Sequence, residues 1–223
     1  MKNKLKAALV ACCITATGFV STAMANPLGR HFDIEITNIT KGIVYTPFLA
    51  ATHTRRVSLF EVGEEASESV GRVAEGGDIA PLKLELDEHE NVFETMTTEG
   101  LLQPGESVNL ELTGVGNASL VSIISMLLPT NDGIVALRGA KLPRGQASSV
   151  TYFMYAYDAG TETNDELCIN IPGPQCGGVP FSPEDLGEGY IYSHPGIHGE
   201  ADLSRSQYQW DGAIAKVVIT RMR

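Results

Sequence analysis

The 223-residue chain has few cysteines, a single tryptophan and no long uninterrupted apolar run. Its most apolar stretch near the N-terminus, residues 7–20, is short and interrupted by Thr and Gly, so no membrane-spanning helix is expected. The Gly-x-Ser-x-Gly pattern of a nucleophile elbow is also missing. Basic residues are scarce: 16 Lys and Arg face 27 Asp and Glu, giving a formal charge of −11. Such an acidic chain is a poor partner for nucleic acid or anionic membranes.

The N-terminus has the composition of an export signal. Three lysines at positions 2, 4 and 6 precede the weak apolar stretch, and Ala23-Met24-Ala25 supplies a small-x-small cleavage pattern. Residues 9–12 also resemble a bacterial lipoprotein box ending at Cys12, but only about five apolar residues precede it. We therefore predict a signal peptide over 1–25 and one domain over 26–223 with a charge of −14. The protein would be exported by a bacterium, to the periplasm or to the outside of the cell.

Two cysteines remain in the predicted mature chain, Cys168 and Cys176. Two prolines and a glycine between them favour a turn. A metal site would need further soft ligands, and none lies at suitable spacing. In an oxidising compartment the pair is expected to form a local disulfide, which stabilises the fold by roughly 2–3 kcal/mol.

Period-two alternation of apolar and polar residues dominates the rest of the chain. It occurs at residues 32–37, 82–86, 108–112 and 214–220, while 120–128 and 150–157 are more continuously apolar. Turn signals separate these segments. One stretch differs: residues 64–75 place Ala66, Val70, Val73 and Ala74 on one helical face before Gly76-Gly77. Residues 46–60 are predicted to form a second short helix or an ordered loop. The pattern predicts an all-β, antiparallel β-sandwich with one or two short helices.

Two acidic turns, 130–133 and 157–162, each follow a segment that reads as a buried strand. Because strands deliver their following loops to one edge of a sheet, we expect Asp132, Asp158 and Glu162 to converge. Crowded carboxylates repel one another unless a cation neutralises them, and oxygen-only ligands suit calcium. The alternative is that all three are ordinary turn and surface residues, since Asp and Gly are common in turns for backbone reasons.

Two other functions draw on different residues. A metal-dependent hydrolase would use His53, His194 and His198, although Pro195 and Gly196 make the helical zinc-pair geometry improbable. A carbohydrate-binding module would use exposed aromatics, although aromatics in alternating strands are usually core. The aromatic candidates are Trp210, Tyr152, Tyr155, Tyr157, Tyr190 and Tyr192.

A set of short motifs occurs in the order found in the spondin domain family, which the chain resembles over about residues 32–221. The motifs are 36–40 (ITNIT), 51–53 (ATH), 74–78 (AEGGD), 125–126 (SM), 130–133 (TNDG), 158–162 (DAGTE) and 196–199 (GIHG).

The resemblance implies a C2-like antiparallel β-sandwich with a calcium site in loops at one end. The residues that match the family's metal carboxylates are Asp132, Asp158 and Glu162, the last being often Asp in animal members. It further implies a non-enzymatic recognition or adhesion-type module whose partner is an extracellular or cell-surface protein or glycan. The chain contains no Arg-Gly-Asp tripeptide that would suggest an integrin contact.

Overall fold

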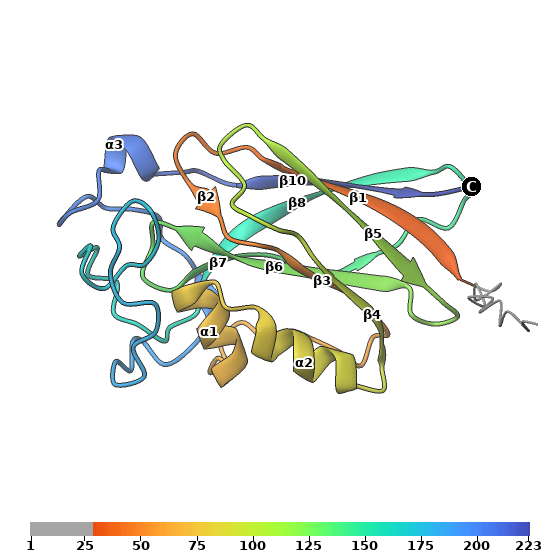
Figure 1. The fold of residues 1–223 in the computed structure, drawn as a ribbon, viewed down its shortest axis with the longest axis horizontal. Helices are drawn as coiled ribbons and strands as arrows, with labels where there is room; N and C mark the ends of the chain where they lie inside the picture. Colours follow the sequence, from red (N-terminus) through yellow and green to blue (C-terminus); the bar gives the residue numbers. More distant parts are fainter. Residues whose placement is uncertain (1–28) are drawn as a thin grey trace, which may run out of the picture.

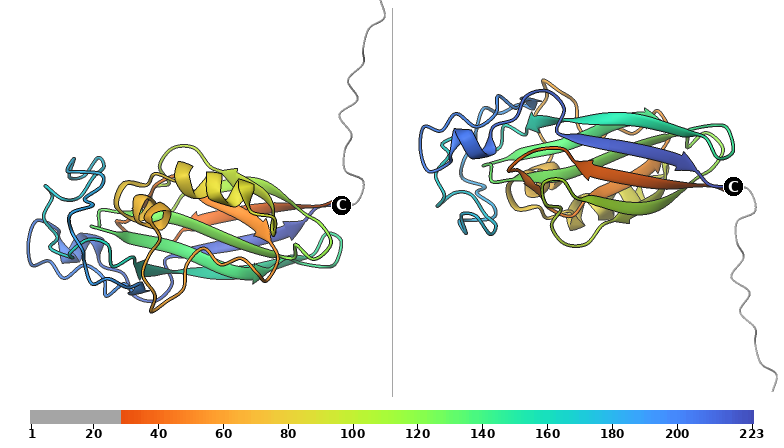
Figure 2. Two further views of the ribbon diagram at one scale, coloured as in Figure 1. Left: turned by 90° about the horizontal axis from the view of Figure 1, so that it is seen from below. Right: turned by 90° about the horizontal axis from the view of Figure 1, so that it is seen from above.

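The computed structural model describes residues 29–223, so the predicted signal peptide lies outside the described residues. The described part contains ten strands and three helices (Figures 1 and 2). Their bounds are β1 Arg30–Asn38, β2 Val44–Tyr45, β3 Leu49–His53, α1 Glu68–Gly76, α2 Ala80–Glu88, β4 Val92–Thr97, β5 Ser107–Gly114, β6 Leu120–Leu128, β7 Gly133–Lys141, β8 Ser149–Asp158, β9 Tyr192–Ser193, α3 Arg205–Tyr208 and β10 Ala215–Arg221.

The strands form one sheet in the order β4-β3-β6-β7-β8-β10-β1-β5, with β2 beside β6 and β9 beside β8. Every pairing is antiparallel. The sheet folds over into two facing layers (Figure 2), and side-chain bonds link its two edges. Thr52 Oγ1 donates to the Thr113 carbonyl at 2.7 Å, and the Thr113 N–H donates to the Glu94 carboxylate. The all-β antiparallel prediction is confirmed, and the sheet is nearly closed.

The alternating strands place their apolar side chains between the layers. In β1, Phe32, Ile34 and Ile36 are fully buried while the residues between them are not. The same face meets Val217 and Ile219 of β10, which pairs with β1 in register. Each such side chain contributes roughly 1.5–3 kcal/mol by leaving water.

Helix α1 covers part of the second apolar cluster, beneath β6 and β7 in Figure 1. It begins at Glu68, four residues after the start of the predicted segment, because Ser67 acts as its N-cap and accepts a hydrogen bond from the Val70 N–H. Val70 and two neighbours on the predicted face are buried, and Gly77 ends the helix in the left-handed conformation.

The prediction of a strand at 82–86 is wrong, because these residues lie within helix α2. The buried residues are Leu82 and Leu86, four apart, whereas Leu84 is 61% exposed. Leucine, lysine and glutamate favour helices over strands, and Pro81 in the first turn is typical of a helix start. The alternation of Leu with charged residues fits both the two-residue period of a strand and the i, i+4 spacing of a helix. The helix-favouring composition therefore predicts the structure of this segment better than the alternation does.

Residues 46–60 form no helix. They contain β3, followed by turns and loop. This strand is buried along its whole length because Ala50 packs into the main core on one face, while Leu49 and Ala51 pack on the other face into the cluster that the helices cover. Among residues 29–223, no helix combines the length and apolar character needed to cross a membrane.

The long loop between β8 and β9 contains the disulfide. Cys168 and Cys176 are bonded with a Cα–Cα distance of 4.7 Å, as predicted. The bond packs beside a small apolar cluster formed by Ile171, Ile197 and Leu203. This cluster gives the irregular end of the molecule a core of its own.

Candidate functional site

The two predicted acidic turns lie side by side at one end of the sheet. In the β7–β8 pairing Gly133 is opposite Asp158, so Asp132, just before β7, is adjacent to the last residue of β8. The Asp132 carbonyl accepts the N–H of Ala159 at 3.2 Å. We call this region, marked by Asp132 and Asp158, the acidic end.

Asp132 is fully buried, and its two carboxylate oxygens differ. Oδ2 accepts the backbone N–H groups of Thr161 at 2.7 Å and Glu162 at 3.1 Å. Oδ1 has no hydrogen-bond partner within the described residues. Burial, and then the negative charge of Asp158, raise the pKa of Asp132 to about 8. A buried oxygen acceptor without a partner is costly and calls for an explanation.

Asp158 is also fully buried, but both of its oxygens have partners. Oδ1 accepts the Gly160 N–H at 2.9 Å, and Oδ2 accepts Nδ2 of Asn164 at 2.6 Å. The same Asn164 nitrogen contacts the Tyr192 hydroxyl at 3.1 Å, which ties the loop to β9. Burial raises the pKa of Asp158 to about 6, although these hydrogen bonds oppose the rise.

Glu162 contributes its backbone to Asp132 and turns its side chain toward helix α1. Burial raises the pKa of its carboxyl to about 8, and the nearby charge of Glu75 raises it further, followed by that of Asp132. The Ser182 hydroxyl opposes this rise. Within residues 29–223, no three His, Cys, Asp or Glu side chains are grouped so that all could hold one ion.

Two further buried carboxylates were not predicted from the sequence. Glu75 of α1 accepts the Ser182 N–H at 2.7 Å. Glu166 accepts three consecutive N–H groups, those of His198 at 2.5 Å, Gly199 at 2.8 Å and Glu200 at 3.1 Å. Glu166 is thus fully satisfied and braces a loop. Nothing in its sequence context distinguishes it from a surface glutamate, because its partners are 32–34 residues away.

The three histidines of the hydrolase alternative do not come together. His53 ends β3 opposite Leu120, whereas the His194 N–H donates to the Ala156 carbonyl near the end of β8. Ala156 pairs with Val135 and Leu120 pairs with Lys141, so the two positions are six residues apart along β7, about 20 Å. A zinc site shared by His53, His194 and His198 is therefore ruled out.

Each of the two buried histidines has a local structural contact. The His53 Nδ1 lies 2.7 Å from the Thr54 carbonyl and must donate to it, so Nε2 accepts from Ser122 Oγ at 2.8 Å. The His194 ring meets Trp210 edge-on at 5.0 Å, and burial lowers the pKa of His194 to about 3.

The aromatic residues of the carbohydrate alternative form no common platform. Tyr157 packs edge-on against Phe60 at 5.2 Å, and Tyr152 packs against the main core. Tyr190 and Tyr192 lie together on another part of the surface, at 5.5 Å, while Tyr155 is exposed by itself. Trp210 is half-buried against His194.

One comparison with known proteins identifies a relationship. The family model Spondin_N matches residues 35–166, more than half of the chain and a range that includes all three predicted site residues. No curated protein matches the chain.

Proposed function

The chain belongs to the spondin N-terminal domain family, and from this premise we propose that it is a calcium-binding, non-enzymatic recognition module. The family is of an extracellular type and generally non-catalytic, and the Cys168–Cys176 disulfide accords with export. In this proposal the protein is exported to the periplasm or beyond the cell and contacts an extracellular or cell-surface protein or glycan.

The observation that carries the calcium proposal is the unpartnered Oδ1 of Asp132. It is a buried carboxylate oxygen beside a second buried carboxylate, Asp158, in a neighbourhood where pKa values are raised. A divalent cation would supply both the missing partner for Oδ1 and the positive charge that offsets the repulsion. Without such an ion, burying two neighbouring carboxylates costs free energy through desolvation and repulsion.

Asp132 and Asp158 would hold the ion, and Glu162 would join them only by moving its carboxylate, since the three are not grouped around one point in this structure. Calcium takes six to eight oxygen ligands, so backbone carbonyls and water would complete its shell. When bound, calcium would neutralise these carboxylates and join the β6–β7 turn to the loop after β8. In this chain Asp132 already makes half of that connection through the Thr161 and Glu162 N–H groups.

Calcium titration with Asp132→Asn tests the proposal. A site of an extracellular module is expected to have a Kd of roughly 0.1–1 mM. Calcium at ten times the Kd would then add about 1.4 kcal/mol, or roughly 3–6 °C in Tm for a domain of this size. Asp132→Asn should abolish that rise in Tm. In EDTA the same variant should be at least as stable as the parent, because it removes a buried negative charge.

Asp211→Asn is the matched control, since Asp211 is exposed and its side chain makes no hydrogen bond or ion pair within residues 29–223. It should retain the full calcium-dependent rise. If Asp132→Asn keeps the rise, or loses stability equally with and without calcium, Asp132 is structural and the proposed metal site is wrong.

A further inference from the structure

A second polar site lies at the opposite end of the sheet, where the C-terminus is marked in Figure 1. The loops around β1, β3, β5 and β7 enclose a cavity of about 600 Å³ there. Its walls include Arg30, Arg55, Arg56 and Arg144, with Asn91 and Asn117 between them. We call this region, defined by the four arginines, the arginine end.

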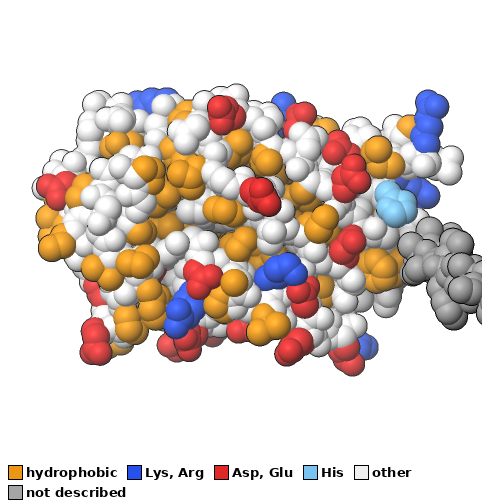
Figure 3. All heavy atoms as spheres, in the orientation of Figure 1, with side chains coloured by type: hydrophobic (Ala, Val, Ile, Leu, Met, Phe, Trp, Pro, Cys, Tyr) orange, Lys and Arg blue, Asp and Glu red, His pale blue; other side chains and the backbone are white. Residues whose placement is uncertain are grey.

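The charge of this cavity is opposite to that of the molecule. The chain has 27 acidic residues, and acidic side chains are spread over much of the face shown in Figure 3, yet none of them lines the cavity. The ion pairs among residues 29–223 are Arg72–Glu68, Lys83–Asp87 and Arg138–Glu61, so the four arginines have no carboxylate partner there. Four guanidinium groups around one space repel each other and leave many N–H donors unused.

The walls are held by the fold rather than by a ligand. Arg30 donates to the Gly116 carbonyl at 3.3 Å, which fixes the start of β1 against the β5–β6 turn. The Thr54 N–H donates to the Asn91 carbonyl at 3.0 Å, and Thr54 Oγ1 accepts the Arg56 N–H at 3.3 Å. The backbone beneath the arginines is therefore positioned before anything binds.

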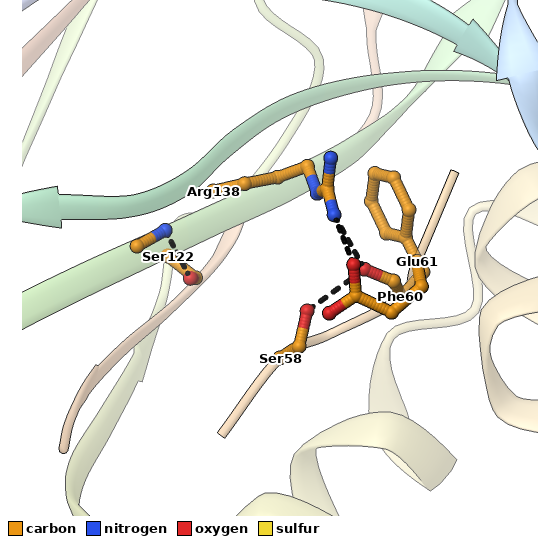
Figure 4. A network of polar contacts seen from close by, with 6 residues as sticks. Ser58, Phe60, Glu61, Ser122 and Arg138 are labelled. Carbon is orange, nitrogen blue, oxygen red and sulfur yellow. Dashed lines mark hydrogen bonds and ion pairs between the residues drawn. The ribbon is translucent and has the colours of Figure 1, made fainter. Parts of the chain in front are cut away.

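A neighbouring cavity of about 490 Å³ shares Arg55 and Arg56 and is bordered by Arg138. Figure 4 shows how Arg138 differs: it donates to Glu61 Oε2 at 2.8 Å and to the Phe60 carbonyl at 3.1 Å. Its charge is already neutralised, whereas Arg55 and Arg56 stand between the two cavities without such partners. Because Glu61 also lines this second cavity, the uncompensated positive charge available to a ligand is that of Arg55 and Arg56 on the side of the first cavity.

We propose that the arginine end binds the phosphate or sulfate groups of an extracellular glycan. Guanidinium groups bind such oxyanions in bidentate fashion, and the neighbouring amide and hydroxyl groups can bond a sugar. The cavity has the size typical of a small-molecule site. No aromatic side chain lines it, so it lacks the stacking surfaces that single-stranded nucleic acids use. The acidic remainder of the chain also repels a long polyanion.

The test uses two small probes, sucrose octasulfate and inositol hexakisphosphate, titrated calorimetrically at an ionic strength of about 0.15 M in EDTA. Because calcium is absent and the two sites are at opposite ends, the outcome is independent of the proposed function. The parent protein should bind at least one probe, and the preferred probe names the natural group as sulfate or phosphate. Arg55→Gln/Arg56→Gln should weaken that binding at least about tenfold.

Lys41→Gln/Arg205→Gln is the charge-matched control, because both residues are exposed and lie away from the arginine end, beside α3. It should change binding by less than about threefold, as expected for a long-range charge effect. If Arg55→Gln/Arg56→Gln fails to fold, Arg144→Gln is tested in its place. This single substitution should also weaken binding of the probe. The proposal is overturned if neither probe binds, if the control weakens binding equally, or if a single-stranded DNA 12-mer binds as tightly as either probe.

Discussion

At one end of the sheet the loops after β6 and β8 bury carboxylates, whereas at the other end the loops after β3 and β7 expose arginines. Desolvation makes the two ends behave differently. Asp132 and Asp158 are removed from water, so their charge is costly and the pKa of each is raised. Arg55, Arg56 and Arg144 stay hydrated and charged at little cost. In our proposals an ion would offset the charge of the acidic end, whereas the arginine end is stable without a ligand and would exchange bound water for one.

The largest expected effect comes from a glycine at the acidic end. Gly160 has φ +66°, and a Cβ there would lie 2.3 Å from the Tyr190 carbonyl oxygen. Gly160→Ala should cost about 2–4 kcal/mol, from backbone strain and from displacing the loop after β8. Chemical denaturation in EDTA measures the loss without any contribution from calcium.

Gly116→Ala is the matched change at the arginine end. Gly116 also has a positive φ, +51°, but a Cβ there meets nothing within 4 Å. Only the backbone term should remain, about 1 kcal/mol. Equal losses in the two variants would mean that the acidic end is no more tightly packed than the arginine end.

The second prediction concerns pH. The pKa values of Asp132, Asp158 and Glu162 are raised in the fold, so their contribution to stability is present at low pH and lost as pH rises through about 6 to 8. In EDTA, Tm should fall between pH 6.5 and pH 8. His194 and His53, whose pKa values are lowered by burial, act in the opposite direction because the unfolded state takes up their protons more readily; this effect is largest below about pH 6.5 and small above about pH 7.

Saturating calcium should flatten or reverse this slope, because the ion stabilises the charged carboxylates. Thermal melts at several pH values, with EDTA and with calcium, provide the measurement. A Tm in EDTA that rises steadily from pH 6.5 to pH 8 would contradict the raised pKa values of this end.

The smallest expected effect is on stability at the arginine end. Arg55 and Arg56 are exposed and unpaired among the described residues, so Arg55→Gln/Arg56→Gln should change the free energy of unfolding by less than about 0.5 kcal/mol. Urea denaturation of the variant and the parent checks this. A loss above about 2 kcal/mol would show that the two arginines stabilise the fold, which would contradict a role in ligand binding alone.

Local pattern was sufficient where one face of a strand is buried and the other is not. The alternation in residues 32–37 and 108–112 predicted β1 and β5. The Asp132 and Asp158 turns were expected to meet because strands deliver the loops that follow them to one edge of a sheet, and β6 and β8 do run in the same direction on either side of β7. The local pattern gave the wrong prediction at residues 82–86, because the same sequence also fits a helix that buries Leu82 and Leu86. Distance in the sequence hid Glu166, whose role depends on a loop more than 30 residues away.

By itself, the sequence determined the all-β character, the Cys168–Cys176 pair and the acidic turns, because each depends on neighbours within about ten residues along the chain. Only the tertiary structure decided which carboxylates are buried, that His53 lies far from His194, and that Arg30, Arg55 and Arg144 surround one cavity. These features come from segments brought together by the strand order, and burial and charge proximity are properties of that arrangement rather than of any single segment.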